Sequence, residues 1–172
     1  MKRVIIDANI YGRILEKFHQ NIIKEATEKG VLKGHLVIYG FDIIRKELRS
    51  TSSNIKIGDI KLRIALLNLY DILVSKHTLS LNSEIRNLAQ QYYEVYKEIG
   101  GAYGKEEVLN DFAIVAGASI NNLDINYSDD NKTMINQKAV KSYEIVNKIR
   151  RFRTPRFENY PSFIKEIRRL LT

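Results

Sequence analysis

The sequence predicts an α/β fold: a three-layer α/β/α sandwich with a central parallel sheet of four to five strands. Two observations lead to this prediction. Short apolar runs of strand length alternate along the chain with longer amphipathic patterns, and no internal repeat or low-complexity tract interrupts the alternation. With 172 residues, 44% of them hydrophobic and 28% charged, the chain has the size and composition of one ordinary globular domain.

Four apolar runs are expected to form strands of the sheet. They are Val4–Ile6, Leu36–Tyr39, Ile72–Val74 and Leu123–Tyr127. Because helical patterns lie between these runs, the strands should be parallel and helices should cover both faces of the sheet.

Five helices are expected between the strands, within residues 18–31, 41–48, 60–69, 83–99 and 106–120. Gly100 and Gly101 should end the fourth helix, because glycine favours the backbone conformation that follows a helix. The fifth helix should approach the sheet closely because it contains four small residues at helical spacing: Ala113, Ala116, Gly117 and Ala118.

The positive charge of the chain is concentrated near its C-terminus. The formal net charge is +8, from 28 Lys and Arg against 20 Asp and Glu. Residues 132–172 hold eleven of the basic and three of the acidic side chains, so residues 1–131 carry seventeen of each. Such a concentration suits a polyanion, most plausibly nucleic acid. The alternative is a solvated basic surface without such a partner.

Composition also limits the compartment and the metal chemistry. The chain has no cysteine, which excludes disulfides and thiolate metal ligands. No apolar run is long enough to cross a bilayer, and no signal peptide precedes the first strand. We therefore expect a cytoplasmic protein without a membrane partner.

Asp7 stands where the first expected strand ends, in the stretch VIIDANIYG. A carboxylate at this place could cap the helix that follows. It could also be the first ligand of a metal site, because open α/β sheets bind ligands at the carboxyl ends of their strands.

Further acidic residues occupy comparable places. Glu47 lies on the helix after the second strand, Asp111 lies on the fifth helix, and Asp129 and Asp130 follow the last strand. A parallel sheet can bring these side chains together, and without a cation they would repel one another. A ligand set made only of oxygen atoms favours Mg²⁺ or Mn²⁺.

Each of these residues also has a simpler interpretation. Glu47 could pair with its neighbours Arg45 or Lys46 on the protein surface. Asp111 could occupy the first turn of its helix, where the helix dipole favours a negative charge.

The order of these motifs resembles the PIN domain family, the ribonuclease fold of VapC-type toxins. The sequence DAN follows the first strand, KEL lies on a helix, NDFAIVAGA comes next, and YSDDNKTM ends a strand. The resemblance extends from Val4 to about Met134. It implies a single PIN-like domain over residues 1–172, with a basic helical C-terminal segment from about residue 132. The family often has an aromatic residue after the last Asp, whereas Thr133 and Met134 occupy that region here.

The resemblance also implies a set of site residues. The implied catalytic carboxylates are Asp7, Glu47, Asp111 and Asp130. The implied metal ligands are Asp7, Asp111 and Asp130, with Asp129 as an adjacent competitor for the last place. Asn9 and Ser128 match the small polar residues that support the first and the last motif.

In function, the resemblance implies an endoribonuclease that uses Mg²⁺ or Mn²⁺ to hydrolyse RNA phosphodiester bonds. Arg150, Arg151 and Arg153 would then hold the RNA backbone. A toxin role would add a cognate antitoxin and a homodimer, whereas the long basic C-terminus suits an RNA-processing nuclease outside such a pair.

Two other classes are alternatives. A PIN-fold RNA-binding or assembly protein would carry the same residues without catalysis. A phosphatase of the haloacid dehalogenase type also places Asp after its first strand, but it needs a second Asp two residues later, where this chain has Asn9.

Overall fold

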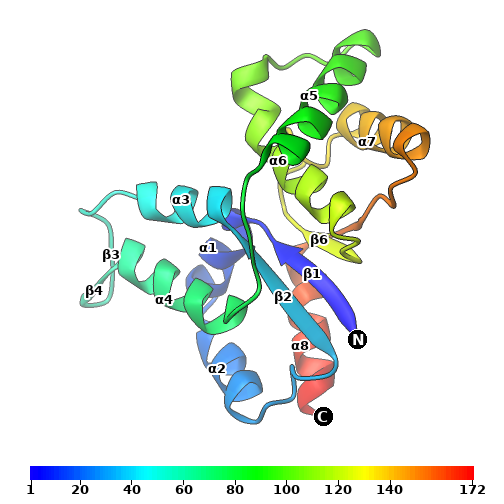
Figure 1. Ribbon diagram of the computed structural model, residues 1–172. Coiled ribbons are helices and arrows are strands. Elements are labelled where there is room, and N and C mark those ends of the chain that lie inside the picture. The colour runs from blue at the N-terminus through cyan, green and yellow to red at the C-terminus, as the bar shows by residue number, and fades with distance from the viewer.

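Five parallel strands form the central sheet of the computed structural model, which describes all 172 residues (Figure 1). Their order is β5-β2-β1-β6-β7, so the first strand of the chain lies in the middle. The strands are β1 (Lys2–Ile6), β2 (Leu36–Phe41), β5 (Thr78–Leu79), β6 (Ile125–Tyr127) and β7 (Arg156–Glu158). Because every pair is parallel, the carboxyl ends of all five strands lie along one edge of the sheet.

The central strand β1 is apolar because both of its faces are covered. Val4, Ile5 and Ile6 have no exposed surface. Val4 pairs with Ile38 of β2 on one side and with Ile125 of β6 on the other. An uninterrupted apolar run is what a strand buried on both faces requires.

Eight helices surround the sheet. They are α1 (Ala8–Glu16), α2 (Gln20–Glu28), α3 (Asp42–Ser50), α4 (Leu62–Val74), α5 (Ser83–Glu98), α6 (Lys105–Ile120), α7 (Gln137–Arg150) and α8 (Tyr160–Leu171). A short antiparallel hairpin, β3 (Lys56–Ile57) and β4 (Ile60–Lys61), lies between α3 and α4. None of the helices combines the length and the apolar character needed to span a membrane.

The helices form two layers, one on each face of the sheet (Figure 1). Helices α5, α6 and α7 pack together on one face, and α1, α2, α4 and α8 pack on the other, with α3 beside α1 and α4. The ring of Tyr127 packs on Phe163 of α8, whereas Phe157 of β7 packs on Tyr143 of α7. The predicted three-layer α/β/α sandwich with a parallel sheet of four to five strands is therefore confirmed.

One local prediction was wrong, one predicted helix is shorter than its apolar pattern, and one strand was missed. Ile72–Val74 is the last turn of α4, because the apolar pattern that starts at Leu62 continues through it, and the edge strand β5 follows instead. The helix predicted within residues 18–31 is shorter, because Phe18 adopts a positive φ of 55° that separates α1 from α2. Strand β7 was missed, because its three residues carry charges at both ends.

The close approach predicted for α6 is present. A β-carbon added to Gly117 would lie 3.1 Å from Cε1 of Phe41, the buried last residue of β2. A side chain at this position would require the Phe41 ring to shift by a few tenths of an ångström. Gly100 also has its predicted role, since it follows the end of α5 with a φ of 85°.

The C-terminal segment is built into the domain. Helix α7 packs on α5, β7 pairs with β6 in parallel, and α8 packs on α2. Its apolar residues Tyr143 and Phe163 are buried in the core. The basic side chains of the segment therefore lie on the outside of two core helices and a strand.

Candidate active site

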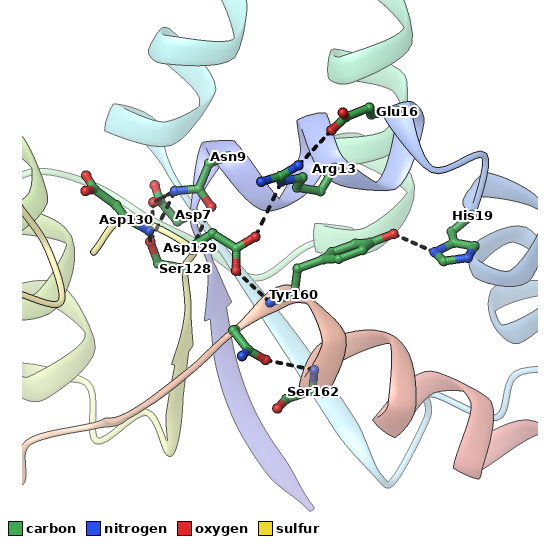
Figure 2. A network of polar contacts seen from close by, with 11 residues as sticks. Asp7, Asn9, Arg13, Glu16, His19, Ser128, Asp129, Asp130, Tyr160 and Ser162 are labelled. Atoms are coloured by element: carbon green, nitrogen blue, oxygen red, sulfur yellow. Dashed lines mark hydrogen bonds and ion pairs between the residues drawn. The ribbon is translucent and has the colours of Figure 1, made fainter. Parts of the chain in front are cut away.

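The ends of the two central strands bring the first and last sequence motifs together. Asp7 directly follows β1, and Ser128 directly follows β6. Ile6 pairs with Tyr127 in the sheet, and the backbone N–H of Asp7 donates to the carbonyl oxygen of Tyr127 at 2.9 Å. Asp7 and Ser128 consequently lie at the same edge of the sheet (Figure 2).

Asp7 is buried, with 5% of its surface exposed, and both of its carboxylate oxygens accept hydrogen bonds. Oδ1 accepts from the backbone N–H of Ala8 at 2.8 Å, so Asp7 caps α1. Oδ2 accepts from the hydroxyl of Ser128 at 2.7 Å and from the amide of Asn9. Burial raises the pKa of Asp7 to about 6 against the effect of these hydrogen bonds, and the charge of Asp130 adds to the rise. Capping and membership of a carboxylate site are therefore compatible.

Asn9 and Ser128 connect the start of α1 to the turn after β6. The amide nitrogen of Asn9 donates to Oγ of Ser128 at 3.1 Å, and its Oδ1 accepts from the backbone N–H of Asp129 at 3.1 Å. Oγ of Ser128 also accepts from the backbone N–H of Asp130 at 3.0 Å. These contacts fix the turn that carries Asp130 relative to Asp7 (Figure 2).

Asp111 and Asp130 share the hydroxyl group of Thr133. Its Oγ1 lies 2.5 Å from Oδ2 of Asp111 and 2.5 Å from Oδ2 of Asp130. A hydroxyl has only one proton to donate, so it can donate to only one of the two carboxylates. The other short contact requires either a proton on that carboxyl group or a cation bound between the two oxygens. Burial raises the pKa of Asp111 to about 7. Burial also acts on Asp130, but hydrogen bonds from Thr133 and Lys132 outweigh it and lower the pKa of that carboxyl group. Of the two carboxyl groups, Asp111 therefore has the higher pKa and Asp130 the lower.

Glu47 approaches the same place from α3. It forms no ion pair, because Arg45 pairs instead with Asp71 at 3.1 Å. Partial burial raises the pKa of Glu47 to about 6, and the negative charges of Asp7 and Asp130 raise it further. The structure therefore does not show the alternative interpretation, in which Glu47 is neutralised by Arg45 on the surface.

Four carboxylates thus influence one another without a basic partner. We call Asp7, Glu47, Asp111 and Asp130 the carboxylate cluster. The charged groups with the largest effects on the pKa values of its first three members are themselves members of the cluster. Such a grouping is unfavourable unless a proton or a bound cation offsets the repulsion.

The donor atoms of the carboxylate cluster fit a hard divalent cation, because all of them are oxygens and the chain has no cysteine. As the side chains stand, no three carboxylate or histidine groups are arranged to hold one ion. Mg²⁺ commonly binds proteins through one or two carboxylates and keeps several water molecules. The cluster therefore suits an ion held by few side chains and completed by water.

Asp129 faces away from the carboxylate cluster. Its Oδ1 accepts from the backbone N–H of Tyr160 at 2.9 Å, and its Oδ2 lies 3.5 Å from Nε of Arg13 (Figure 2). Tyr160 in turn contacts His19, at Nδ1. Asp129 thus joins the turn after β6 to the start of α8, and the structure places Asp130 rather than Asp129 beside Asp7.

The three arginines predicted to bind RNA lie at the opposite edge of the sheet. Arg153 pairs with Asp124 at 2.8 Å, and Asp124 precedes β6. Arg150 and Arg151 lie at the far end of α7, whose 14 residues span about 20 Å at 1.5 Å per residue. The structure therefore does not bring these arginines to the carboxylate cluster.

Sequence reasoning missed Thr133 as a member of the site. Its position three residues after Asp130 was visible, but its contact with Asp111 depends on how α6 packs against the turn after β6. Asp111 itself lies beyond the first turn of α6, where Glu107 instead accepts from the backbone N–H of Gly104 at 2.8 Å. The interaction of a first-turn carboxylate with the helix dipole therefore does not explain the presence of Asp111 at this position.

Comparison with known proteins gives similarity in structure only. No protein-family model and no curated protein sequence matches the chain. A chain in the crystal structure of VapBC2 from Rickettsia felis, bound to a DNA fragment from its promoter, is similar with a TM-score of 0.56 and 14% identity. The match covers 91% of this chain and 98% of that one.

Two further structures are similar to the same degree. VapBC-1 from nontypeable Haemophilus influenzae has a TM-score of 0.57 and 15% identity, over 92% of this chain and 98% of that chain. DNA-bound VapBC from Salmonella typhimurium has a TM-score of 0.55 and 14% identity, over 93% and 99%. At such identities the similarity establishes the fold, and the chain has the PIN-like α/β/α fold of the VapBC structures that its sequence motifs predicted.

Proposed function

We propose that this protein is a metal-dependent endoribonuclease that hydrolyses phosphodiester bonds of RNA. The observation that carries the proposal is the carboxylate cluster, in which four acidic side chains from separate elements meet at the carboxyl edge of the sheet without a basic partner. The PIN-like fold of the whole chain supports the same assignment.

Mg²⁺ or Mn²⁺ would bind among Asp7, Asp111 and Asp130 in this proposal, to one or two of them directly and to the rest through water. The cation would supply Lewis acidity and offset the negative charge of the scissile phosphate. Asn9 and Ser128 orient the Asp7 carboxylate through their hydrogen bonds to its Oδ2. The remaining oxygen, Oδ1, accepts one hydrogen bond and keeps a lone pair for a ligand.

Glu47 would take the proton of the attacking water. It is the exposed member of the cluster, and its raised pKa of about 6 makes it a stronger base than an ordinary glutamate while it remains ionised at neutral pH. Thr133 would keep Asp111 and Asp130 at the separation seen between them. No side chain in the cluster is suited to form a covalent intermediate, so hydrolysis would be direct.

A protein partner is a second part of the proposal. The similar structures are VapBC assemblies, which supports a cognate antitoxin. An apolar groove of about 420 Å³ lies between α1, α2, the β3–β4 hairpin and α4. Its rim exposes large side chains: Phe18 is 71% exposed, Ile60 54% and Ile72 48%. An exposed apolar surface of this kind suits a partner or a second copy in a homodimer.

Association through this groove can be tested by light scattering after chromatography, with and without the product of the neighbouring gene. Ile60→Asp and Ile72→Asp should weaken association. Ile149→Asp, at a residue 73% exposed elsewhere on the surface, should not. Equal behaviour of all three variants would remove this groove as the interface.

The catalytic proposal is tested by incubating the protein with labelled single-stranded RNA and Mn²⁺, with and without a chelator. We expect cleavage that the chelator stops. An RNA-binding or assembly protein without catalysis would bind the RNA and leave it intact. Cleavage that continues in the chelator would contradict the metal dependence.

A further inference from the structure

A tyrosine and a lysine form an aromatic–cation pair beside the carboxylate cluster. The ammonium group of Lys132 lies 5.3 Å from the centre of the Tyr103 ring. Tyr103 belongs to the loop between α5 and α6, and Lys132 belongs to the turn between β6 and α7. Two loops far apart in the sequence therefore meet at this edge of the molecule.

Both residues are tied to the elements that carry the site. The backbone N–H of Lys132 donates to Oδ1 of Asp130 at 2.9 Å. The backbone N–H of Tyr103 donates to the hydroxyl of buried Tyr96 at 3.2 Å. The next residue, Gly104, is the N-cap of α6, the helix that carries Asp111. The backbones of Tyr103 and Lys132 are thus held in place relative to the carboxylate cluster.

Two more lysines hold the loop that carries Tyr103. Nζ of Lys97 donates to the carbonyl oxygen of Gly101 at 2.8 Å, and Nζ of Lys138 donates to that of Gly100 at 2.5 Å. Neither these lysines nor Lys132 forms an ion pair with a carboxylate. One lysine without an ion pair therefore lies over the half-buried ring of Tyr103, and two more hold the loop that carries it.

Tyr103 differs from the other tyrosines near it. Tyr92 and Tyr96 are buried and pack against other rings, so they are unable to offer a face to a ligand. Tyr103 is only partly covered, and its neighbour on the ring is the flexible side chain of an exposed lysine. A base could take the place of that lysine on the ring while the ammonium group moves to a phosphate.

We propose that Tyr103, Lys132, Lys97 and Lys138 form the binding surface for single-stranded RNA that leads to the carboxylate cluster. One base stacks on the Tyr103 ring, and the lysines neutralise the adjoining phosphates. Stacking of this kind needs an unpaired base, which favours a single strand over a duplex. This inference rests on the proposed nuclease function, and it places the substrate strand on the side of the cluster nearest Asp130.

The test measures affinity for a short fluorescent single-stranded RNA by anisotropy, in chelator so that the strand is not cut. Tyr103→Leu should weaken binding about tenfold, the typical worth of one stacked base. Tyr103→Phe keeps the ring and should bind as the wild type does. Tyr39→Leu is the matched control, because Tyr39 carries an arginine at the same 5.3 Å from its ring and lies elsewhere on the sheet.

The lysine is tested through salt dependence. Lys132→Gln should reduce the slope of log affinity against log salt by about 0.7, the value for one phosphate contact on a single strand. Lys148→Gln, at the far end of α7, should leave the slope unchanged. Lys132 is exposed, so its replacement is expected to leave the fold intact.

The outcomes separate this inference from the proposed function. If the wild type cleaves RNA but Tyr103→Leu and Lys132→Gln bind it normally, the surface is wrong and the nuclease assignment stands. If the two variants lose binding but the wild type never cleaves, the surface is supported and the nuclease assignment fails. If the wild type neither binds nor cleaves RNA, the RNA surface is overturned.

Discussion

The hydroxyl of Ser128 donates a hydrogen bond of 2.7 Å to Oδ2 of Asp7, although 121 residues separate them in the chain. The bond exists because β1 and β6 are neighbours in the sheet and end side by side. Both groups are buried, so little water is available to replace either partner. This single contact joins the first and last motifs of the sequence.

Ser128→Ala should therefore affect both stability and activity. Losing the donor leaves a buried carboxylate oxygen less satisfied, which should cost about 1–3 kcal/mol in the free energy of unfolding. Misorientation of a metal-site carboxylate should reduce cleavage by about 10- to 100-fold. Urea unfolding and RNA cleavage measure the two effects. Ser128→Thr keeps the hydroxyl and should recover most of both, and its failure to do so would remove the hydrogen bond as the cause.

Asp7→Asn should abolish cleavage and leave the fold intact. Replacing a residue that only orients a metal ligand typically lowers activity about 10- to 100-fold. Loss of a direct ligand should therefore lower the cleavage rate at least about 100-fold. Removing one charge from a repulsive group should also stabilise the metal-free protein. Asp124→Asn is the control, because Asp124 lies at the other end of β6 and pairs with Arg153. A folded Asp7→Asn variant with near-normal activity would show that Asp7 is not a metal ligand of the active site.

Asp130→Asn and Asp129→Asn should have opposite profiles. Asp130 contacts the hydroxyl that it shares with Asp111, so its replacement should lose activity. Asp129 holds the first residue of α8 and pairs with Arg13, so its replacement should cost about 1 kcal/mol of stability and spare most of the activity. Cleavage rates and denaturation curves of the two variants measure the loss of activity and the loss of stability separately. Greater loss of activity at position 129 would show that the last motif is placed one residue too late.

The metal-free protein should become less stable as pH rises from about 5 to about 8. Asp7 and Glu47 have pKa values raised to about 6, and Asp111 to about 7, against 3.8 and 4.5 for ordinary Asp and Glu. In this window the folded state binds more protons than the unfolded state, so each rise in pH favours unfolding. Mg²⁺ should restore stability most at pH 8, where the cluster is ionised.

Asp111→Asn should flatten this pH dependence. The measurement is the urea midpoint of the wild type and of Asp111→Asn at pH 5.5, 7 and 8, in chelator. Glu166, whose pKa hydrogen bonding to Arg169 lowers to about 2, changes charge only at lower pH and does not interfere. A wild-type midpoint that rises between pH 5.5 and 8 would mean that the carboxylates are ionised and compensated in the folded protein.

Arg150, Arg151 and Arg153 should matter only for long RNA. Arg150 and Arg151 lie about 20 Å along α7 from its start, and Arg153 pairs with Asp124 at the other end of β6, so a short strand held at the cluster would not reach them. Replacing all three with Gln should lower the salt slope for a long single strand by up to about 0.7 per lost contact and leave turnover at saturation unchanged. An unchanged slope on long RNA, with a changed oligomeric state, would assign the segment to assembly.

Much of the site could be predicted because its signals are local. Asp7 stands at the end of an apolar run, and Asp130 follows Ser128 by two residues after another such run. Both positions are set by strand ends, which short sequence patterns locate well. The contact of Thr133 with Asp111 and that of Lys132 with Tyr103 were not visible, because each depends on how two separate loops pack.

The errors in the fold have the same origin. Ile72–Val74 reads as a strand over three residues, and only the longer pattern from Leu62 shows that it ends a helix. The charge count located an excess of basic residues after residue 131, but it contained no information on which edge of the sheet they occupy. Arg153 pairs with Asp124 at the edge away from the site, which a linear sequence does not show.

The most direct test of the central claim is a crystal structure of the protein with Mn²⁺, read from the anomalous scattering of the metal. We expect a peak within the carboxylate cluster, at about 2.1 Å from an oxygen of at least one of Asp7, Asp111 and Asp130, the usual distance for a small divalent cation. Asp7→Asn should lower the height of this peak. A crystal with Mn²⁺ bound elsewhere and none at the cluster would show that the carboxylate cluster is not a metal site.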